Sequence, residues 1–436
     1  MMVKFNRLKL IYWRDFRKVL GAFFKLVYSK HHYLRKGDLM DLVNVLFVMV
    51  ATILVFFMTP GLAFFYGGLV PRQNMVNTFI GVFFICGLAS LLWVLVGYSL
   101  SFSGHGLFVG NLGALMMHHL NLAHLLPDSR IPLGLYALYQ MMFAIITPAL
   151  FIGAIVGRVR LPFLAAFIIG WSLLVYYPLV HMVWGGGILQ YLGILDFAGG
   201  TVVHVNAGMT AFALSILVGP RLDRTLRHDN QALVLLGTSM LWLGWYGFNA
   251  GSALAINEIA VQAMVTTTVA TAGAMVAWQA LELIFQPHVT LVGTCTGALC
   301  GLVAITPATG YVTITGAALI GIGGSVISYL FVRFIKPRLK FDDTLDAFGC
   351  HGISGIWGSI ATGLFATHAV NSAVLHNGLL YGGGWYQLLL QIGATVITMF
   401  YTLGMVWILY RILSRLMPVR MSARDEVRGW RSEIVE

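Results

Sequence analysis

The chain has 436 residues, of which 58% are hydrophobic and 10% are charged, and its mean hydropathy is +0.83. Long runs with almost no charge exclude a soluble globular domain and predict an all-α polytopic membrane protein. The formal net charge of +11 would suit a nucleic-acid partner, but the positions of the basic residues, described below, argue against one.

The first 41 residues are more basic than the rest of the chain and contain ten of its 27 Lys and Arg residues. Residues 14–28 place Phe16, Leu20 and further apolar side chains on one helical face, which suits a helix lying on a membrane surface. The segment has too many charges and too short an apolar core for a signal peptide. The alternative is that translation begins at Met40, and the sequence leaves both interpretations open.

Eleven apolar segments follow this extension, and each is predicted to span the membrane. In chain order they cover residues 42–66, 78–102, 132–157, 161–182, 196–218, 230–250, 259–283, 289–305, 314–335, 347–366 and 385–411. We expect one membrane domain over residues 42–411 and a short tail over 412–436. The 49 glycines of the chain fit close packing of helices in lipid.

The remaining basic residues are distributed unevenly between the two faces that eleven spans define. Arg130 falls in a connection predicted to lie outside, and the other sixteen fall on the opposite face. These are Arg72, Arg158, Arg160, Arg221, Arg224, Arg227, Arg333, Lys336, Arg338, Lys340 and six residues within 411–431. An excess of Lys and Arg marks the cytoplasmic side. We therefore predict a multi-pass protein of the plasma or inner membrane, with its C-terminus cytoplasmic and its N-terminus outside.

The chain has the pattern of an internal duplication. The stretch "HVNAGMTAF" begins at His204 and "HGISGIWGS" begins at His351, and a glycine follows each His four residues later, Gly208 and Gly355. Five spans per repeat, an odd number, force the two halves into opposite orientations, with a substrate path at their interface. The halves cover about residues 42–218 and 230–366, and a final helix covers 385–411.

His204 and His351 both lie at membrane depth within their predicted spans. A buried His usually satisfies a hydrogen bond in the core, but that explanation would have to hold twice, at equivalent positions. Ionisable residues inside a membrane indicate a functional site, and two neutral imidazoles can share a proton. An Asp precedes each His, Asp196 by eight residues and Asp346 by five. We expect Asp196 to cap the free N–H groups of its helix; direct contact with a passing cation is the second possibility.

A metal site is not expected. The two histidines lack a third ligand in a matching place, and no cofactor is predicted. All four cysteines fall in predicted spans, which argues against a disulfide framework and a thiolate metal site; they are Cys86, Cys295, Cys300 and Cys350. Cys350, next to His351, could line a cavity, although a small buried apolar side chain is the favoured interpretation.

Three stretches predict an aromatic site at an outer entrance. "HMVWGGGILQ" contains Trp184, "YQMMFAIIT" contains Phe143, and "WYGFNAGSA" contains Phe248 and Ser252. The faces of a Trp and a Phe can hold a cation, a Ser hydroxyl can accept its hydrogen bond, and an aromatic pair behind them would block water and ions. The alternative for Trp184 is an anchor at the membrane interface.

With these residues the sequence resembles the ammonium transporter family (Amt/Mep/Rh), and its Amt/Mep branch in particular. The resemblance covers about residues 41–411 in family order. The matching stretches are "GLAFFYGGLVPRQN" (61–74), "HMVWGGG" (181–187), "DFAGGTVVHVNAG" (196–208), "WYGFNAGSA" (245–253), "TPATGYV" (306–312) and "DAFGCHGISGIWGSIATGLFA" (346–366). It implies eleven spans, an inverted five-plus-five repeat, and a homotrimer with one pore per subunit.

The resemblance also implies roles for individual residues. Trp184, Phe143 and Ser252 correspond to the outer ammonium recruitment site, and Phe143 and Phe248 to the stacked phenyl gate. His204 and His351 correspond to the twin pore histidines, and Asp196 to the carboxylate that organises the outer site. Tyr176 and Trp245 match further aromatic residues near the pore, and Tyr139 replaces a Phe that is usual near the entrance.

The implied function is an ammonium transporter or ammonia channel rather than an enzyme. Ammonium would lose its proton at the outer site, and ammonia would pass the histidines, with or without separate proton transfer. An ammonium sensor with little net transport is the first alternative. An intramembrane hydrolase is the second, but the sequence lacks a nucleophile–base motif.

Regulation by a trimeric PII signalling protein is predicted to be weak or absent. The tail "VRMSARDEVRGWRSEIVE" keeps Glu426 and Gly429 in a family-like arrangement. Trp430 and Arg431 stand where Leu and Asp are usual in the family, and an Arg in place of an acid would repel a complementary contact. A basic tail held by anionic lipid is the other interpretation.

Overall fold

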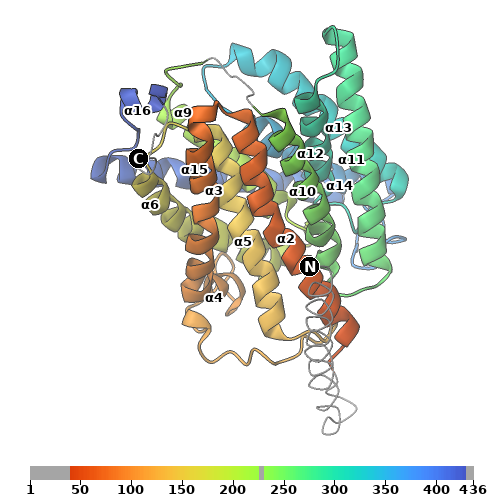
Figure 1. Cartoon of the computed structure of the whole chain (residues 1–436). Helices are drawn as coiled ribbons and strands as arrows, with labels where there is room; N and C mark the ends of the chain where they lie inside the picture. Colours follow the sequence, from red (N-terminus) through yellow and green to blue (C-terminus); the bar gives the residue numbers. More distant parts are fainter. Residues whose placement is uncertain (1–39, 225–229, 429–436) are drawn as a thin grey trace, which may run out of the picture.

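The computed structural model describes residues 40–224 and 230–428, and within these ranges it contains helices and isolated bridges but no strand. Figure 1 shows long, mostly upright helices packed into one bundle, with α16 (Ala423–Arg428) at the end opposite the start of α2 (Leu42–Leu69). The predicted surface helix over residues 14–28 and the tail residues Gly429, Trp430 and Arg431 lie outside the described residues.

The first half contains five helical spans, of which two are interrupted by a π-helical turn and a third begins with one. The elements are α2 (Leu42–Leu69); α3 (Arg72–Leu92) with η1 (Trp93–Gly97) and α4 (Tyr98–Phe102); α5 (Leu133–Ile155); α6 (Leu161–Trp171) with η3 (Ser172–Tyr176) and α7 (Tyr177–Trp184); and η4 (Gly200–Val205) with α9 (Asn206–Val218). Two short helices lie in the connections, η2 (Leu115–Met117) and α8 (Ile188–Tyr191).

The second half repeats this plan and ends with one further helix. Its elements are α10 (Gln231–Ala250); α11 (Glu258–Phe285); α12 (Leu291–Ile305); α13 (Ile314–Leu330) with η6 (Phe331–Ile335) and η7 (Lys336–Arg338); η8 (Phe348–Gly352) with α14 (Ile353–Phe365); and α15 (Tyr386–Leu416). The short turns η5 (Gly251–Ala253) and η9 (Leu379–Tyr381) lie in the connections.

Each of the eleven predicted spans coincides with one of these helices or helical runs, although some ends differ. Helix α3 begins at Arg72 rather than 78. Pro71 directly precedes the helix, and the first turn of the helix carries the charged Arg72. Helix α15 extends to Leu416 rather than 411. Among the described helices, length and composition alone identify eight that could cross a membrane.

Polar residues fix where several spans begin. The Asp41 side chain accepts hydrogen bonds from the N–H groups of Val43 and Asn44 at the start of α2. Asn230, Asn257, Thr290 and Thr313 cap α10, α11, α12 and α13 in the same way. Each cap satisfies a backbone donor that the helix leaves free, which matters most where lipid offers no partner.

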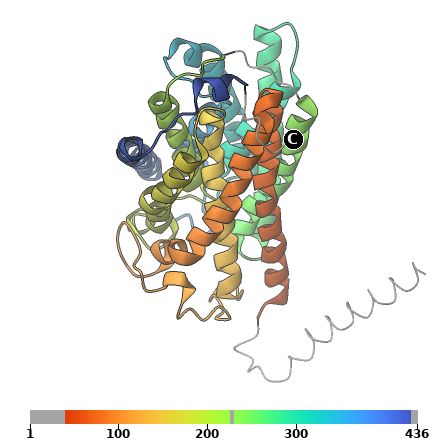
Figure 2. The same ribbon diagram turned by 60° about the vertical axis from the view of Figure 1, so that its left-hand side comes forward.

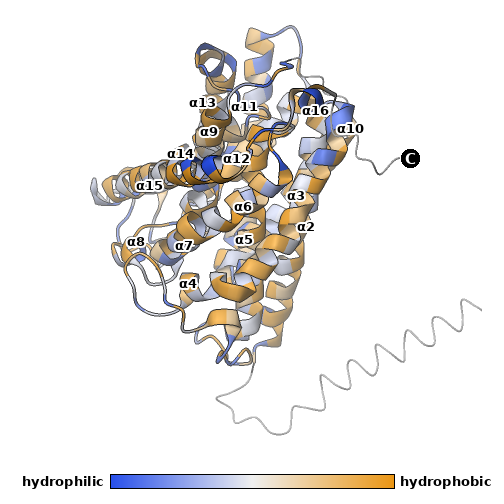
Figure 3. Cartoon of the chain, turned by 90° about the vertical axis from the view of Figure 1, so that its left-hand side faces the viewer, coloured by the Kyte–Doolittle hydropathy of each residue, from blue (hydrophilic) through white to orange (hydrophobic). Residues whose placement is uncertain are grey.

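Glycine allows the closest contacts between spans. A Cβ at Gly237 of α10 would overlap the backbone of Phe65 in α2, and a Cβ at Gly68 of α2 would lie 2.7 Å from the Asn230 carbonyl oxygen. Helix α15 packs on α6, α9 and α14 and crosses the bundle steeply; Figure 2 views its dark-blue end nearly along the helix axis, on the left of the bundle, away from the upright red α2. Figure 3 shows hydrophobic residues along the helices and hydrophilic residues near their ends, including α16.

Candidate functional site

The site begins where Asp196 organises the start of η4. Its carboxylate accepts hydrogen bonds from the backbone N–H groups of Gly199, Gly200 and Thr201 at 2.8, 2.6 and 2.9 Å, and from the Thr201 hydroxyl. Gly199 has a φ of 113°, a conformation that favours glycine, and this sharp turn brings the N–H groups together. The carboxylate therefore caps the helix that carries His204, as the sequence predicts.

The equivalent residue in the second half is Asp343, and the predicted equivalence of Asp346 was wrong. Asp343 precedes His351 by eight residues, the spacing of Asp196 from His204. Its carboxylate accepts hydrogen bonds from the N–H groups of Ala347 and Phe348 at 3.0 and 2.8 Å. Asp346 points elsewhere and forms an ion pair with Lys336.

The predicted aromatic-site residues form a connected group next to the histidines. The Trp184 indole N–H donates to the Asp196 carbonyl oxygen at 2.9 Å, and its ring lies 6.0 Å from that of Phe143. The rings of Phe143 and Phe248 are 4.4 Å apart at 38°, and both residues are buried. Ser252 donates to the Phe248 carbonyl oxygen at 2.8 Å, so its hydroxyl oxygen lies beside this group.

His204 and His351 lie below Phe248, and each occupies a π-helical turn, η4 or η8. The His204 ring lies 5.8 Å from Phe248 and 5.4 Å from His351, and the two imidazole planes differ by 13°. Trp245 stacks on His204 at 5.3 Å, and its indole N–H donates to Thr306. π-Helical turns are rare and frequent at functional sites, and here one presents each imidazole to the other.

The polar atoms of this histidine pair are largely unpaired. Both ring nitrogens of His204 and Nδ1 of His351 have no hydrogen-bond partner among the described residues, although both side chains are buried. A buried polar group without a partner is costly, which indicates that these atoms serve something other than packing. Glycine permits the close approach: a Cβ at Gly208 would overlap the backbone of Gly352, and one at Gly355 would lie 3.1 Å from Cβ of His204.

A cavity of about 60 Å³ continues from His351 towards the opposite end of the bundle. Tyr66, Asp346 and Cys350 also line it, and the Tyr66 hydroxyl donates to the Leu150 carbonyl oxygen at 2.6 Å. Together with the aromatic group, the two histidines and this cavity form a continuous row through the membrane domain.

Comparison with known proteins identifies the family. The Ammonium Transporter Family profile matches residues 46–433. The chain belongs to the ammonium transporter family. It is 41% identical over 404 residues to an ammonium transporter of Aquifex aeolicus, covering 92% of this chain and 94% of that protein. It is 39% identical over 394 residues to an ammonium transporter of Bacillus subtilis, covering 89% and 96% of the two chains.

Solved structures of the ammonium transporter family share the fold. Candida albicans Mep2 matches with a TM-score of 0.83 at 30% identity, covering 90% of this chain and 89% of that one. A protein described as "Sensor Amt Protein" matches with a TM-score of 0.83 at 26% identity, covering 90% and 98%.

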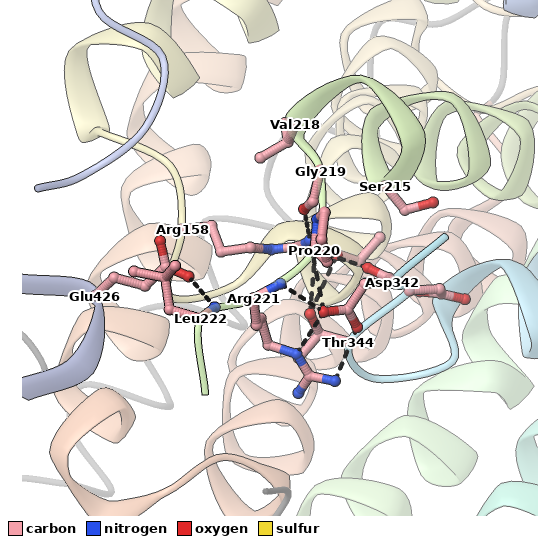
Figure 4. A network of polar contacts seen from close by, with 12 residues as sticks. Arg158, Ser215, Val218, Gly219, Pro220, Arg221, Leu222, Asp342, Thr344 and Glu426 are labelled. Atoms are coloured by element: carbon pink, nitrogen blue, oxygen red, sulfur yellow. Dashed lines mark hydrogen bonds and ion pairs between the residues drawn. The ribbon is translucent and has the colours of Figure 1, made fainter. Parts of the chain in front are cut away.

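The basic face of this ammonium transporter holds a buried ionic network, centred on Arg158 and Asp342 (Figure 4). Arg158 is fully buried and donates to the carbonyl oxygens of Ala154 and Asp342 and to the Thr344 hydroxyl. Arg221 donates through two nitrogens to the Asp342 carboxylate, each at 2.8 Å. The network therefore joins three connections that lie far apart in the sequence.

Burial and charge act on this pair in opposite directions. Burial lowers the pKa of Arg158 to about 10, which still leaves the guanidinium charged at neutral pH. Burial alone would raise the pKa of Asp342, but the hydrogen bonds and charge of Arg221 hold it below its usual value. The tail is tied to the same region, because the buried Glu426 carboxylate accepts from the Leu222 N–H and from Arg420.

Sequence reasoning did not assign a role to three residues of this family member. Asp343 stands among other acids in "DDTLD", and Arg158 was counted among the basic residues of a loop. The buried His181 has its Nδ1 3.0 Å from the Ser101 carbonyl oxygen and its Nε2 2.6 Å from that of Gly106, so it ties an outer loop to the helix that ends at Trp184. The eight-residue spacing before His204 and His351 was a usable signal for Asp343; the contacts of Arg158 and His181 are mostly with backbone groups far away in the sequence.

No group of three His, Cys, Asp or Glu side chains that could hold a metal ion occurs within residues 40–224 and 230–428.

Proposed function

We propose that this chain recruits ammonium at Trp184, Phe143 and Ser252, removes its proton, and conducts ammonia past His204 and His351. The observation that carries the proposal is the stacked, buried histidine pair with unpaired ring nitrogens at the centre of the row of aromatic residues. The relatives named as ammonium transporters support the substrate.

Desolvation explains why the proton must leave. A charge at the centre of a bilayer costs about 2.5–3.5 kcal/mol even on the mildest scale. An amine such as a Lys side chain has a pKa of about 10.4, so ammonium resembles it and is mainly a cation at neutral pH. The Trp184 and Phe143 faces attract that cation, and the stacked Phe143–Phe248 pair closes the path to hydrated ions. Asp196 positions the Trp184 indole through its carbonyl oxygen and the first turn of η4 through its carboxylate.

The proton has two routes. It either returns to the outer solution, so that the net transport is of neutral ammonia, or it crosses through the histidine pair, so that transport carries charge. The described residues include no other pair of neighbouring, unpaired titratable groups along the row, which favours His204 and His351 as the carriers in the second route.

Single substitutions of the two histidines test the proposal. His204→Ala and His351→Ala should each severely reduce ammonium uptake in proteoliposomes, while protein abundance and oligomeric state stay near normal. Simultaneous current recording distinguishes the two proton routes. Full uptake by both variants would contradict the pore assignment.

The wider assignments belong to the same proposal. The family resemblance supports a homotrimer in a cell membrane, and the basic face supports a cytoplasmic C-terminus with the N-terminus outside. PII binding is expected to be weak or absent, because Glu426 is already engaged by Arg420 and Leu222.

A sensor with little net transport is the second candidate. The match to the protein described as "Sensor Amt Protein" favours it. The same uptake measurement separates the two, because a sensor would bind ammonium with little flux through the folded protein.

A further inference from the structure

Two of the four cysteines are in sulfur contact across two separate helices. Cys300 of α12 and Cys350 of η8 have their Sγ atoms 3.7 Å apart, and both side chains are buried. The other two, Cys86 and Cys295, are also buried and free. No other cysteine pair makes such a contact, although all four lie within the described residues.

Cys350 is placed where a small molecule can reach it. It lines the cavity of about 60 Å³ that also contains His351 and Asp346. The Asp346 side chain is 33% exposed, so this cavity opens towards solvent at the basic face. Cys300 lies behind Cys350 and is fully buried. One thiol, that of Cys350, therefore lines the cavity, and the second, that of Cys300, is in contact with it on the side away from the cavity.

We propose that Cys300 and Cys350 form an oxidisable dithiol that closes the pore when it is converted to a disulfide. The inference rests on the proposed function, because it assigns regulation to the same histidine pair. The oxidant class is a peroxide. The Cys350 sulfur attacks a peroxide oxygen and the O–O bond breaks, so that a sulfenic acid forms and the leaving hydroxide takes up the thiol proton as one water. The Cys300 sulfur then attacks the sulfenic sulfur, the S–S bond forms, and the sulfenic hydroxyl leaves with the Cys300 proton as the second water. Two thiols and one hydrogen peroxide thus give one disulfide and two waters.

Packing explains why the disulfide would affect conduction. A disulfide has an S–S distance of about 2.05 Å, so the two sulfur atoms must approach by about 1.6 Å. Cys350 precedes His351 directly. The backbone of the next residue, Gly352, lies so close to Gly208 that a Cβ added at Gly208 would overlap it. We expect closure of the S–S bond to draw η8 towards α12 and, because the neighbouring backbone is closely packed, to displace the adjacent His351 ring from its stack with His204.

A resident metal is a poorer account of the same pair. No third His, Cys, Asp or Glu completes a site in the part of the chain that the structure describes. Structural zinc sites hold the ion with four ligands in a tetrahedral arrangement, and even catalytic zinc sites use three protein ligands, so two sulfur atoms alone do not make such a site.

The test uses the full-length protein in proteoliposomes, first reduced and then treated with hydrogen peroxide. We expect the intact mass to fall by two hydrogen atoms, and proteolysis to yield a linked peptide containing Cys300 and Cys350. Ammonium uptake should fall severalfold and recover with dithiothreitol. Cys300→Ala and Cys350→Ala should make uptake resistant to peroxide.

Cys86→Ala and Cys295→Ala are the matched controls, and both should stay as sensitive as the original protein. Equal sensitivity in Cys300→Ala, absence of the linked peptide after full oxidation, or a linked protein with unchanged uptake would each overturn the inference. The linked peptide is measured on the unsubstituted chain, so poor folding of a variant does not block the test. Failure of the reduced protein to transport would instead contradict the proposed function.

Discussion

The Tyr139 hydroxyl supports the outer aromatic group from behind. It lies 2.9 and 3.0 Å from the carbonyl oxygens of Gly247 and Phe248, and 3.2 Å from the Ser252 hydroxyl. Its ring also packs edge-on against Phe143 at 5.1 Å. A Tyr at this position therefore fixes both members of the phenyl pair.

Removing this hydroxyl should weaken the support without removing the site. Tyr139→Phe keeps the ring contact with Phe143 but loses a buried hydrogen bond, at a cost of about 0.5–1.5 kcal/mol. We expect a modest change in the half-saturating ammonium concentration and little change in maximal uptake. Concentration series in proteoliposomes measure both quantities. Complete loss of uptake in a well-folded variant would show that the hydroxyl does more than support Phe143 and Phe248.

Asp343 predicts a pH dependence of stability. Burial raises its pKa to about 6, against the lowering effect of the Lys336 charge, whereas an unfolded Asp has a pKa of about 3.9. The folded protein therefore binds more protons than the unfolded chain between these values, and this carboxyl's contribution to stability is lost as pH rises from about 4 to 6. Asp343→Asn should flatten that part of the melting-temperature profile. Asp425→Asn, at an exposed carboxyl, is the control and should leave the profile unchanged.

The residues that the sequence could predict are those whose chemistry contrasts with their surroundings. His204, His351 and Trp184 stand out in apolar helices, so residue type and depth were enough to select them. Asp343 was missed because three acids compete within "DDTLD", although the eight-residue spacing that Asp196 shows before His204 would have selected it. His181 was missed because its partners are carbonyl groups 75 and 80 residues away, which carry no sequence signal.

At the scale of helices, the centre of the molecule is a crossing of two spans, η4–α9 and η8–α14, each of which begins with a π-helical turn. The π-helical turns η4 and η8 are equivalent in the two repeats, and each follows an Asp cap. The apolar pattern predicted these spans, but it could not predict the π-helical turns. Each π-helical turn is a single turn within a helical span, and so it leaves the apolar pattern of the span almost unchanged.

Gly208 is the point at which this crossing is closest. A Cβ there would overlap the backbone of Gly352, which cannot move aside as a side chain could. Gly208→Ala should therefore separate α9 from η8, lower the melting temperature and reduce ammonium uptake, with an overpacking cost of about 1–3 kcal/mol. Gly404→Ala is the control, because nothing lies within 4 Å of its added Cβ. Equal effects of the two substitutions would contradict the role of the crossing.

At the scale of the whole molecule, the basic face joins segments that the membrane helices alone leave separate. Arg158 follows α5, Arg221 follows α9, and Asp342 precedes the turn that carries His351. The tail reaches the same place through Arg420, whose side chain donates to the carbonyl oxygens of Val218 and Pro220. The positive-inside pattern predicted a basic face, but it treats each cation as solvated and so gave no reason to expect a buried one.

Arg158 is expected to be the residue of this face on which stability depends most. Arg158→Met keeps most of the side-chain volume but removes the Arg158 donor from the carbonyl oxygens of Gly219 and Asp342 and removes one of the two cations near the Asp342 carboxylate. Loss of one partner of a buried ion pair costs about 3–5 kcal/mol, so the melting temperature in detergent should fall clearly.

Arg415→Met is the control for this prediction, because it removes an exposed cation in the last turn of α15 and should have little effect on the melting temperature. Because Arg221 still holds Asp342 by two hydrogen bonds, the protein that does fold should retain ammonium uptake. An unchanged melting temperature would mean that Arg221 and backbone contacts alone hold the basic face together.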